Sequence, residues 1–136
     1  MLASFYYDEK ISYNKGNSYR RLDMKGIGTD IIEIYRIETL KQRERFIHKL
    51  LSEEELALYQ SFKHVKRQNE FLAGRWAVKE ALYKALGTYC QGKSYQDFSI
   101  VNDELGKPYL LKPVLDGIHI SISHCESSAV AFVIWE

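Results

Sequence analysis

The chain has 136 residues, of which 46% are hydrophobic and 27% charged, and these values fit one globular domain rather than a disordered segment. No apolar run approaches the ~18 residues that a membrane-spanning helix needs, and the N-terminus lacks the pattern of a signal peptide, so we expect a cytoplasmic protein that does not bind membranes. The net charge of +1 excludes a protein that binds nucleic acid through its bulk charge.

The start of the chain differs in character from the rest. Residues 1–23 are polar and rich in tyrosine and show no periodicity, so we expect an N-terminal extension before a single domain over residues 24–136. Sharp patterning begins at Met24, which is a candidate biological start. The segment 26–33 (GIGTDIIE) is rich in isoleucine and predicts a strand.

The middle of the chain is predicted to be helical. Apolar residues recur mostly at helical spacing over residues 34–50. Ser52 opens a capping-box pattern (S-E-E-E), which predicts a helix over residues 53–62. A longer helix is expected over residues 69–86, with a start at residue 69 or a few residues earlier.

The last third of the chain predicts strands. Residues 98–101 and 109–111 are short strand candidates on either side of turn residues, and residues 118–123 alternate strictly between isoleucine and polar side chains. Residues 129–135 (AVAFVIW) are apolar on both faces, which predicts a strand that is covered on both sides. Because short loops join these strands, we expect antiparallel pairing and an α+β fold of one strand, then helices, then a meander.

Asp30 is an acidic residue within the apolar strand predicted over residues 26–33. Aspartate is depleted in strands, and a metal ion would explain its presence. Magnesium typically takes one or two protein carboxylates together with substrate phosphate oxygens and waters. Asp30 and Glu80 could form such a pair. The alternative, in which Asp30 turns the end of the strand and Glu80 faces solvent, stays open at this stage.

Glu80 and Lys84 lie one turn apart on the longer predicted helix, opposite an apolar face that includes Phe71 and Leu82. A glutamate and a lysine at this spacing usually form an ordinary surface pair. Trp76 lies on the same side as Glu80, and a tryptophan there needs something to pack against. The face is therefore expected to be covered by another part of the molecule or by a ligand.

His124 stands where the strand predicted over residues 118–123 ends. A histidine in this place can bind a phosphate or a carboxylate, and a local backbone hydrogen bond explains it equally well. Ser121 and Ser123 share one face of the strand and could donate hydrogen bonds to a phosphate. The chain has no G-x-S-x-G motif, so serine-hydrolase chemistry is not indicated.

Taken together, these segments resemble the holo-acyl-carrier-protein synthases, the small class of 4′-phosphopantetheinyl transferases. The resemblance extends over about residues 24–136 and depends on the order and spacing of several motifs. The family motif G-I-G-x-D-I-x-E is matched through Glu33, whereas Trp76 replaces the usual phenylalanine of the helix motif F-x-x-K-E-A-x-x-K-A. The segments are GIGTDI (26–31), FLAGRWAVKEALYKALG (71–87), GKPY (106–109), ISISH (120–124) and AVAFVI (129–134).

The resemblance implies an enzyme of fatty acid biosynthesis that transfers 4′-phosphopantetheine from coenzyme A to a serine of an apo-acyl carrier protein and releases adenosine 3′,5′-bisphosphate. It implies that Asp30 and Glu80 bind Mg²⁺ on the pyrophosphate and that Lys84 stabilises the leaving group. Glu80 or a magnesium-bound water would accept the proton of the carrier serine. The residues expected to line the coenzyme A pocket or to surround the 3′-phosphate are His124, Ser123, Gly106, Lys107, Pro108, Arg75 and Lys79.

Positive residues exceed negative ones between residues 36 and 49, a pattern that is usually a solvated helix face. In this family an acidic carrier docks on a basic first helix, so the resemblance gives the stretch a role. Arg36 and Arg43 are expected to share a helix face, with Lys41 and Arg45 beside them. The resemblance also implies a homotrimer with active sites between subunits, and the doubly apolar terminal strand fits burial at such an interface.

Three other functions stay open. The same transfer could act on a carrier domain of a peptide or polyketide synthase. The chain could be a binding module that has kept the fold without catalysis, in which case ligand binding would not depend on magnesium. A hydrolase that uses Asp30 and Glu80 would release ADP from coenzyme A with no carrier present.

Overall fold

The computed structural model describes residues 23–136. The N-terminal extension expected over residues 1–23 therefore lies outside the described residues, except for Asp23. The described elements confirm the expected α+β class. In chain order they are β1 (Gly26–Glu33), α1 (Ile34–Glu38), α2 (Arg43–Leu50), α3 (Glu53–Ser61), α4 (Val65–Leu86), the 3₁₀ turns η1 (Gly87–Cys90) and η2 (Tyr95–Asp97), β2 (Ser99–Asn102), β3 (Pro108–Lys112), β4 (Ile118–His124) and β5 (Ser128–Trp135).

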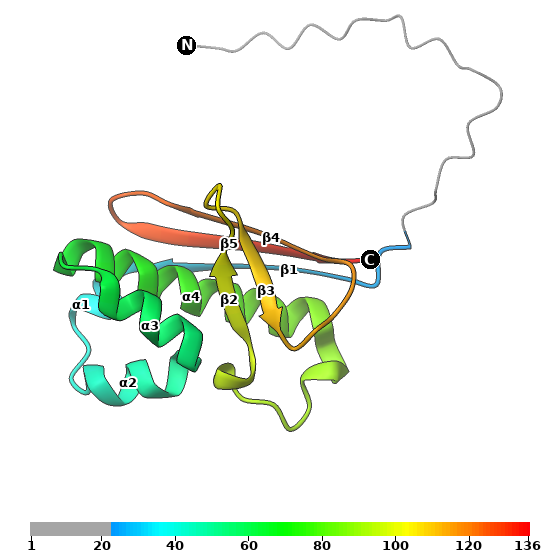
Figure 1. Ribbon diagram of the computed structural model, residues 1–136, viewed down its shortest axis with the longest axis horizontal. Coiled ribbons are helices and arrows are strands. Elements are labelled where there is room, and N and C mark those ends of the chain that lie inside the picture. The colour runs from blue at the N-terminus through cyan, green and yellow to red at the C-terminus, as the bar shows by residue number, and fades with distance from the viewer. Residues whose placement is uncertain (1–22) are drawn as a thin grey trace, which may run out of the picture.

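One layer of the molecule is a three-stranded antiparallel sheet in the order β1–β5–β4, and the helices lie together on one side of it (Figure 1). The terminal strand β5 is central, so that Asp30 of β1 is paired with Ala131 of β5, which is paired in turn with Ile122 of β4. The expected antiparallel pairing is confirmed. The strands do not form one meander, however, because β2 and β3 make a separate two-stranded sheet.

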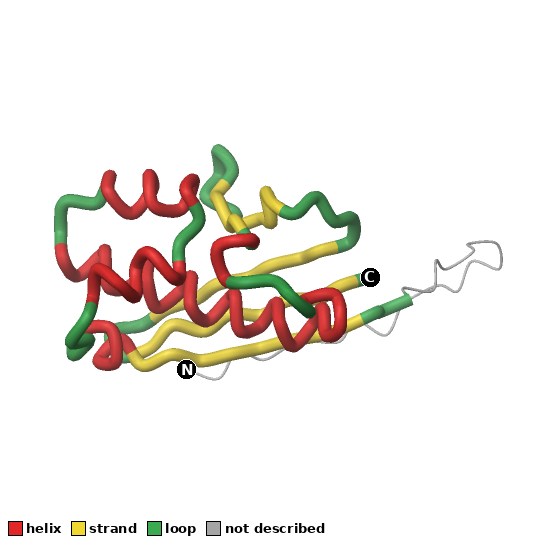
Figure 2. The backbone as a smooth tube through the Cα atoms, turned by 90° about the horizontal axis from the view of Figure 1, so that it is seen from below, coloured by secondary structure: helices red, strands yellow, loops and turns green. Residues whose placement is uncertain are grey.

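Helix α4 runs lengthwise beneath the sheet and carries much of the core (Figure 2). Two glycines of β1 allow the strand to lie directly on the helix backbone. A Cβ atom at Gly26 would collide with the carbonyl oxygen of Ala85, and one at Gly28 with that of Ala81. Asp30 follows on the same face of β1, because side chains alternate along a strand. The glycines thus bring Asp30 against α4.

The helix predicted over residues 34–50 is divided into α1 and α2. Both the amide and the hydroxyl of Thr39 donate hydrogen bonds to the carbonyl oxygen of Tyr35, at 3.1 and 2.9 Å, and end α1 there. The capping box predicted at Ser52 is confirmed, since its hydroxyl accepts from the amide of Glu55 while the Glu55 carboxylate accepts from the amide of Ser52. A side-chain capping pattern in the sequence therefore marks the start of α3.

Helix α4 begins at Val65, a start a few residues before residue 69 that the sequence leaves open. His64 occupies its N-cap without a side-chain hydrogen bond, so no capping pattern marks the start in the sequence. Gly87, with φ of 53°, ends the helix in a backbone conformation that glycine adopts readily. Among the helices of residues 23–136, none is both long enough and apolar enough to cross a membrane.

The two faces of the sheet are covered unequally. Ala131 is fully buried beneath the helices. On the opposite face the exposed fractions are 51% for Ile27, 62% for Ile31, 38% for Val130 and 40% for Phe132. The second cover that the sequence predicts for β5 is therefore not supplied by the described residues of the same chain.

Candidate active site

Two of the three residues predicted to be catalytic, Asp30 on β1 and Lys84 on α4, are in direct contact. The ammonium nitrogen of Lys84 lies 3.2 Å from Oδ1 of Asp30 and donates a 2.8 Å hydrogen bond to the carbonyl oxygen of Thr29. Glu80 precedes Lys84 by one helical turn, so both side chains project from the same side of α4. We call the contacting pair Asp30 and Lys84, together with Glu80 one helical turn before Lys84, the carboxylate site.

The carboxylate of Glu80 accepts a hydrogen bond on Oε1 from the hydroxyl of Tyr95 in η2. Burial, and then the hydrogen bond to Glu80, raise the pKa of Tyr95 to about 12, so the phenol stays protonated and acts as the donor. The sequence analysis did not single out Tyr95. Its only local signal is a short capping box from Ser94 to Asp97, which indicates a turn and not a function.

The carboxylate site fits a magnesium ion. Both Asp30 and Glu80 offer hard oxygen donors, and no group of three or more His, Cys, Asp or Glu side chains suited to a metal occurs among residues 23–136. Magnesium bound with a substrate pyrophosphate needs only one or two protein carboxylates. Lys84 now neutralises Asp30, and its side chain is 54% exposed, so it can move toward an arriving phosphate.

A second group of predicted residues lines a groove of about 200 Å³ at the end of β4. It contains His124, Gly106, Pro108 and Arg75, four of the seven residues predicted to bind coenzyme A. Arg75 donates a 2.8 Å hydrogen bond to Oδ1 of Asn102, whose amide donates at 2.9 Å to the carbonyl oxygen of Gly106. The arginine therefore holds the turn between β2 and β3 against α4. We call this cavity the hairpin groove.

Two residues of the hairpin groove were missed by the sequence analysis. Glu70 places a carboxylate oxygen 3.8 Å from Nδ1 of His124 and 3.9 Å from a guanidinium nitrogen of Arg67. Both belong to the first turns of α4, outside the motif that begins at Phe71. A signal was present, because Arg67, Glu70 and Gly74 follow one another at spacings of three and four on one helix face.

The prediction that Lys79 surrounds the 3′-phosphate is wrong. Its side chain is fully buried and donates hydrogen bonds to the Glu55 carboxylate and to the carbonyl oxygens of Leu50 and Tyr95. Burial lowers the pKa of this lysine, and Glu55 opposes that shift. A lysine whose donors are all directed into the protein interior cannot also contact a ligand at the surface.

Arg75 borders the hairpin groove with most of its charge already engaged. The residue is 4% exposed, and its Nε lies 3.5 Å from Oε2 of Glu55. Burial lowers its pKa to about 10. Ser123 and Lys107 are exposed but do not line the groove. Ser123 lies on the opposite face of β4 from His124, since neighbouring strand residues alternate.

The four residues predicted to dock a carrier lie on or beside α1 and α2. The expectation that Arg36 and Arg43 share one helix face is wrong, because they belong to different helices. The Arg36 guanidinium lies 4.4 Å from the centre of the Trp76 ring. Arg43 is half-buried and donates to the hydroxyl of Tyr59 at 3.4 Å. Tertiary contacts and not helical spacing therefore orient these two arginines.

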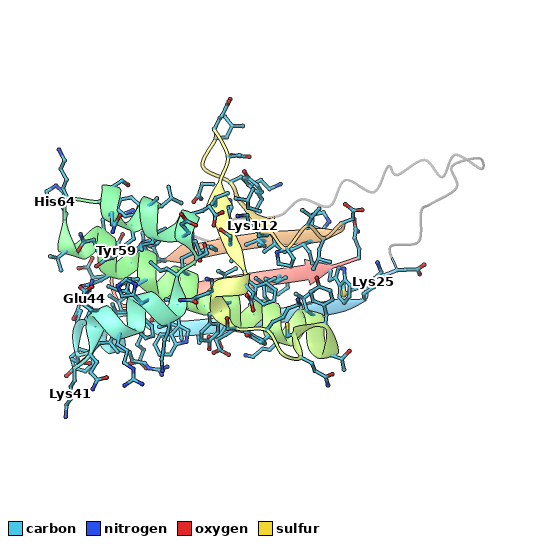
Figure 3. All side chains as sticks on the ribbon, turned by 60° about the horizontal axis from the view of Figure 1, so that its bottom comes forward. Lys25, Lys41, Glu44, Tyr59, His64 and Lys112 are labelled. Atoms are coloured by element: carbon cyan, nitrogen blue, oxygen red, sulfur yellow. The ribbon has the colours of Figure 1, made fainter. Side chains whose placement is uncertain are left out.

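Lys41 and Arg45 complete the basic surface. Both are exposed, and Lys41 projects away from the body of the protein at the outer end of the helical layer (Figure 3). Arg45 donates a 3.3 Å hydrogen bond to the side-chain oxygen of Gln42. The positive groups thus stay available to an acidic partner.

The carboxylate site and the hairpin groove lie at opposite edges of the three-stranded sheet. Asp30 belongs to the edge strand β1, and His124 belongs to the other edge strand β4, with β5 between them. Helix α4 contributes to both, through its C-terminal half at the carboxylate site and its N-terminal half at the groove. One chain therefore presents two separate sets of polar groups, at opposite edges of the sheet.

Comparisons with known proteins agree with this arrangement. Residues 26–133 match the 4′-phosphopantetheinyl transferase superfamily. The holo-[acyl-carrier-protein] synthase of Lactococcus lactis is 48% identical over 82% of this chain and 96% of its own, and that of Staphylococcus carnosus is 49% identical over the same shares. The chain belongs to the 4′-phosphopantetheinyl transferase superfamily, which confirms the resemblance seen in its motifs.

Solved structures give the same picture. The holo-(acyl-carrier-protein) synthase of Bacillus anthracis, in complex with CoA (3′,5′-ADP), has a TM-score of 0.73 at 42% identity and covers 82% of this chain and 95% of its own. The corresponding protein of Neisseria meningitidis has a TM-score of 0.74 at 32% identity, with coverages of 83% and 98%. The chain is thus similar in fold over nearly the whole length of these proteins.

Proposed function

We propose that this protein transfers 4′-phosphopantetheine from coenzyme A to a serine of an apo-acyl carrier protein, a reaction of fatty acid biosynthesis, and releases adenosine 3′,5′-bisphosphate. The observation that carries the proposal is the contact of Lys84 with Asp30 beside Glu80, in a chain of this family. The names of the relatives and the CoA complex of the B. anthracis protein support the two substrates.

In the proposed reaction the serine oxygen forms a bond to the phosphorus that bears pantetheine, and the bond from that phosphorus to the oxygen of the adenosine 5′-phosphate breaks. The serine proton passes to the Glu80 carboxylate or to a water. Asp30 and Glu80 would hold magnesium through their carboxylate oxygens. When bound, magnesium supplies charge neutralisation at the pyrophosphate. Lys84 exchanges Asp30 for a phosphate oxygen and stabilises the negative charge that develops on the leaving bisphosphate.

The proposal includes a homotrimer in which the carboxylate site of one subunit faces the hairpin groove of its neighbour. Two observations support it. The two sites lie at opposite edges of the sheet, where one substrate would have to extend past α4 to reach both in the same chain. The outer sheet face, which includes Ile31 and Phe132, is apolar and uncovered within the described part of the chain. The mass in solution by light scattering tests this arrangement.

Carrier docking on the basic surface is a further part of the proposal. Arg36 lies over Trp76, and Trp76 precedes Glu80 by one helical turn. A carrier held by Arg36 would therefore have its serine near the carboxylate site. Lys41, Arg43 and Arg45 would add to the attraction of an acidic carrier. The expected cytoplasmic location stays a prediction.

The test is intact-mass spectrometry of an apo-acyl carrier protein incubated with coenzyme A, magnesium and either the native chain or Glu80→Gln. We expect a gain of one phosphopantetheine that requires magnesium and Glu80. Glu53→Gln is the matched control, because Glu53 is an exposed glutamate on α3, away from both sites. Including carrier domains of peptide and polyketide synthases identifies the preferred carrier.

Two outcomes would replace the proposal. Release of ADP from coenzyme A in the absence of any carrier would indicate the hydrolase. A folded chain that binds coenzyme A without magnesium and modifies none of the carriers would indicate the binding module.

A further inference from the structure

Tyr95 contacts the carboxylate site from outside all of the motifs that carry the family resemblance. It lies in η2, and its hydroxyl donates to Oε1 of Glu80 across 15 positions of sequence. The residue is half-buried, and it follows the helix motif in a turn before β2. This contact matters because Glu80 is a magnesium ligand in the proposed function.

The position of the Tyr95 phenol is determined by contacts that do not involve Glu80. The buried ammonium group of Lys79 donates a 2.9 Å hydrogen bond to the carbonyl oxygen of Tyr95. The turn is closed by a 2.7 Å hydrogen bond from the amide of Ser94 to the carboxylate of Asp97. The ring of Tyr83 packs edge-to-face on the Tyr95 ring, with centroids 5.6 Å apart. These contacts hold the backbone and the ring of Tyr95 independently of its hydrogen bond to Glu80.

This geometry distinguishes the two oxygens of Glu80. Oε1 accepts a hydrogen bond from the phenol, which makes Oε2 the oxygen with more free lone pairs for a cation. A hydrogen bond to one oxygen also opposes rotation of the carboxylate toward Lys84, one turn further along α4. Groups that orient a metal ligand in this way typically change metal affinity or activity by about 10- to 100-fold when they are removed.

We propose that Tyr95 is a positioning residue that holds the Glu80 carboxylate with one oxygen free for magnesium. The proposal rests on the proposed function, because it takes Glu80 as a magnesium ligand. Under this proposal the buried Lys79 contributes to positioning as well as to stability, because it donates a hydrogen bond to the backbone of Tyr95.

The test compares Tyr95→Phe with Tyr83→Phe in the full-length protein. Each change removes one phenolic hydroxyl and keeps the ring, but the Tyr83 hydroxyl donates to the carbonyl oxygen of Lys93 and not to Glu80. Magnesium binding is measured by calorimetry in the presence of adenosine 3′,5′-bisphosphate. We expect about tenfold weaker binding for Tyr95→Phe, and for Tyr83→Phe a change below about twofold.

Kinetics separate positioning from loss of structure. For Tyr95→Phe the KM for magnesium should rise about tenfold, while kcat at saturating magnesium and the KM for coenzyme A stay close to the native values. Melting curves of both variants check that they fold. A merely structural role would instead lower kcat, and added magnesium would not restore it.

Each of the other outcomes would overturn the role of Tyr95. Equal magnesium affinities for the two tyrosine variants, with Glu80→Gln much weaker, would overturn the role of Tyr95 and leave the proposed function standing. Unchanged magnesium affinity in Glu80→Gln would remove Glu80 as a ligand, and with it both the metal site and the inference. A loss in Tyr95→Phe that excess magnesium does not restore would also overturn the positioning role.

Discussion

Helix α4 contributes a lysine to each of two lysine–carboxylate clusters. The two clusters contain the same kinds of residues but differ in burial. Lys79 and Glu55 are both fully buried, and Arg75 stands beside them at 4% exposure. Lys84 and Asp30 form a pair whose side chains are 54% and 20% exposed. The comparison shows that residue type alone does not determine whether an ion pair is buried or exposed; the surroundings do.

The cause of the difference is the direction in which each lysine leaves the helix. Lys79 and Lys84 project about 140° apart around the helix axis. Lys79 points to α3 and β2, where Glu55 also accepts hydrogen bonds from the amides of Ser52 and Ile100. Lys84 points to β1, an edge strand. Buried charges must be fully paired, whereas an exposed pair can exchange its partners for a substrate.

The largest expected effect is the loss of transfer in Asp30→Asn. Removal of one magnesium ligand should lower kcat/KM by about 10³-fold, because the charge of the pyrophosphate is no longer neutralised. The free energy of unfolding should change by less than about 1 kcal/mol, since a pair this exposed contributes little. Transfer assays and urea titration measure the two quantities. A large fall in stability would mean that this cluster is also structural.

Next in size is the destabilisation in Lys79→Met. The change removes Lys79 and leaves the buried negative charge of Glu55 only partly compensated by Arg75, so the free energy of unfolding should fall by about 3 kcal/mol in urea titration. Lys84→Met is the matched control on the same helix, with an expected change below about 0.5 kcal/mol. If both variants lost a similar free energy of unfolding, the two clusters would not differ in their contribution to stability.

The same variant, Lys84→Met, also tests the contribution of Lys84 to the rate of transfer. A charged hydrogen bond to the leaving phosphate is worth about 1.5–3 kcal/mol, so kcat should fall by roughly 10- to 100-fold. Single-turnover measurement with saturating coenzyme A and carrier isolates this step. If Lys84→Met transferred at the native rate, the lysine would serve only as the counter-ion of Asp30.

The smallest expected effect concerns Arg36, whose exposed charge belongs to neither cluster. Arg36→Glu should raise the KM for an acidic carrier by about tenfold at low salt, with a smaller effect at high salt, because screening weakens such attraction. The KM for coenzyme A should stay unchanged. Lys93→Glu, in the loop between η1 and η2, serves as the control. A parallel rise in both KM values would show that Arg36 belongs to the coenzyme A site instead.

Much of the molecule could be predicted from local sequence alone. The strand at 26–33, the capping box at Ser52 and the long helix follow from periodicity and short-range hydrogen bonding, and the structure confirms them. The motifs likewise indicate Asp30, Glu80 and Lys84, and the structure places Lys84 in contact with Asp30 and one helical turn after Glu80. These features were accessible because their causes lie within a few residues of one another or within a motif.

The rest was decided by contacts between distant segments. Nothing near Lys79 in the sequence reveals that Glu55 lies opposite it, so the lysine was assigned to a ligand that it cannot reach. Tyr95 meets Glu80 only because a turn folds back across α4. Local patterns determine where helices and strands form, but burial and pairing of a charge depend on what the tertiary fold places around it.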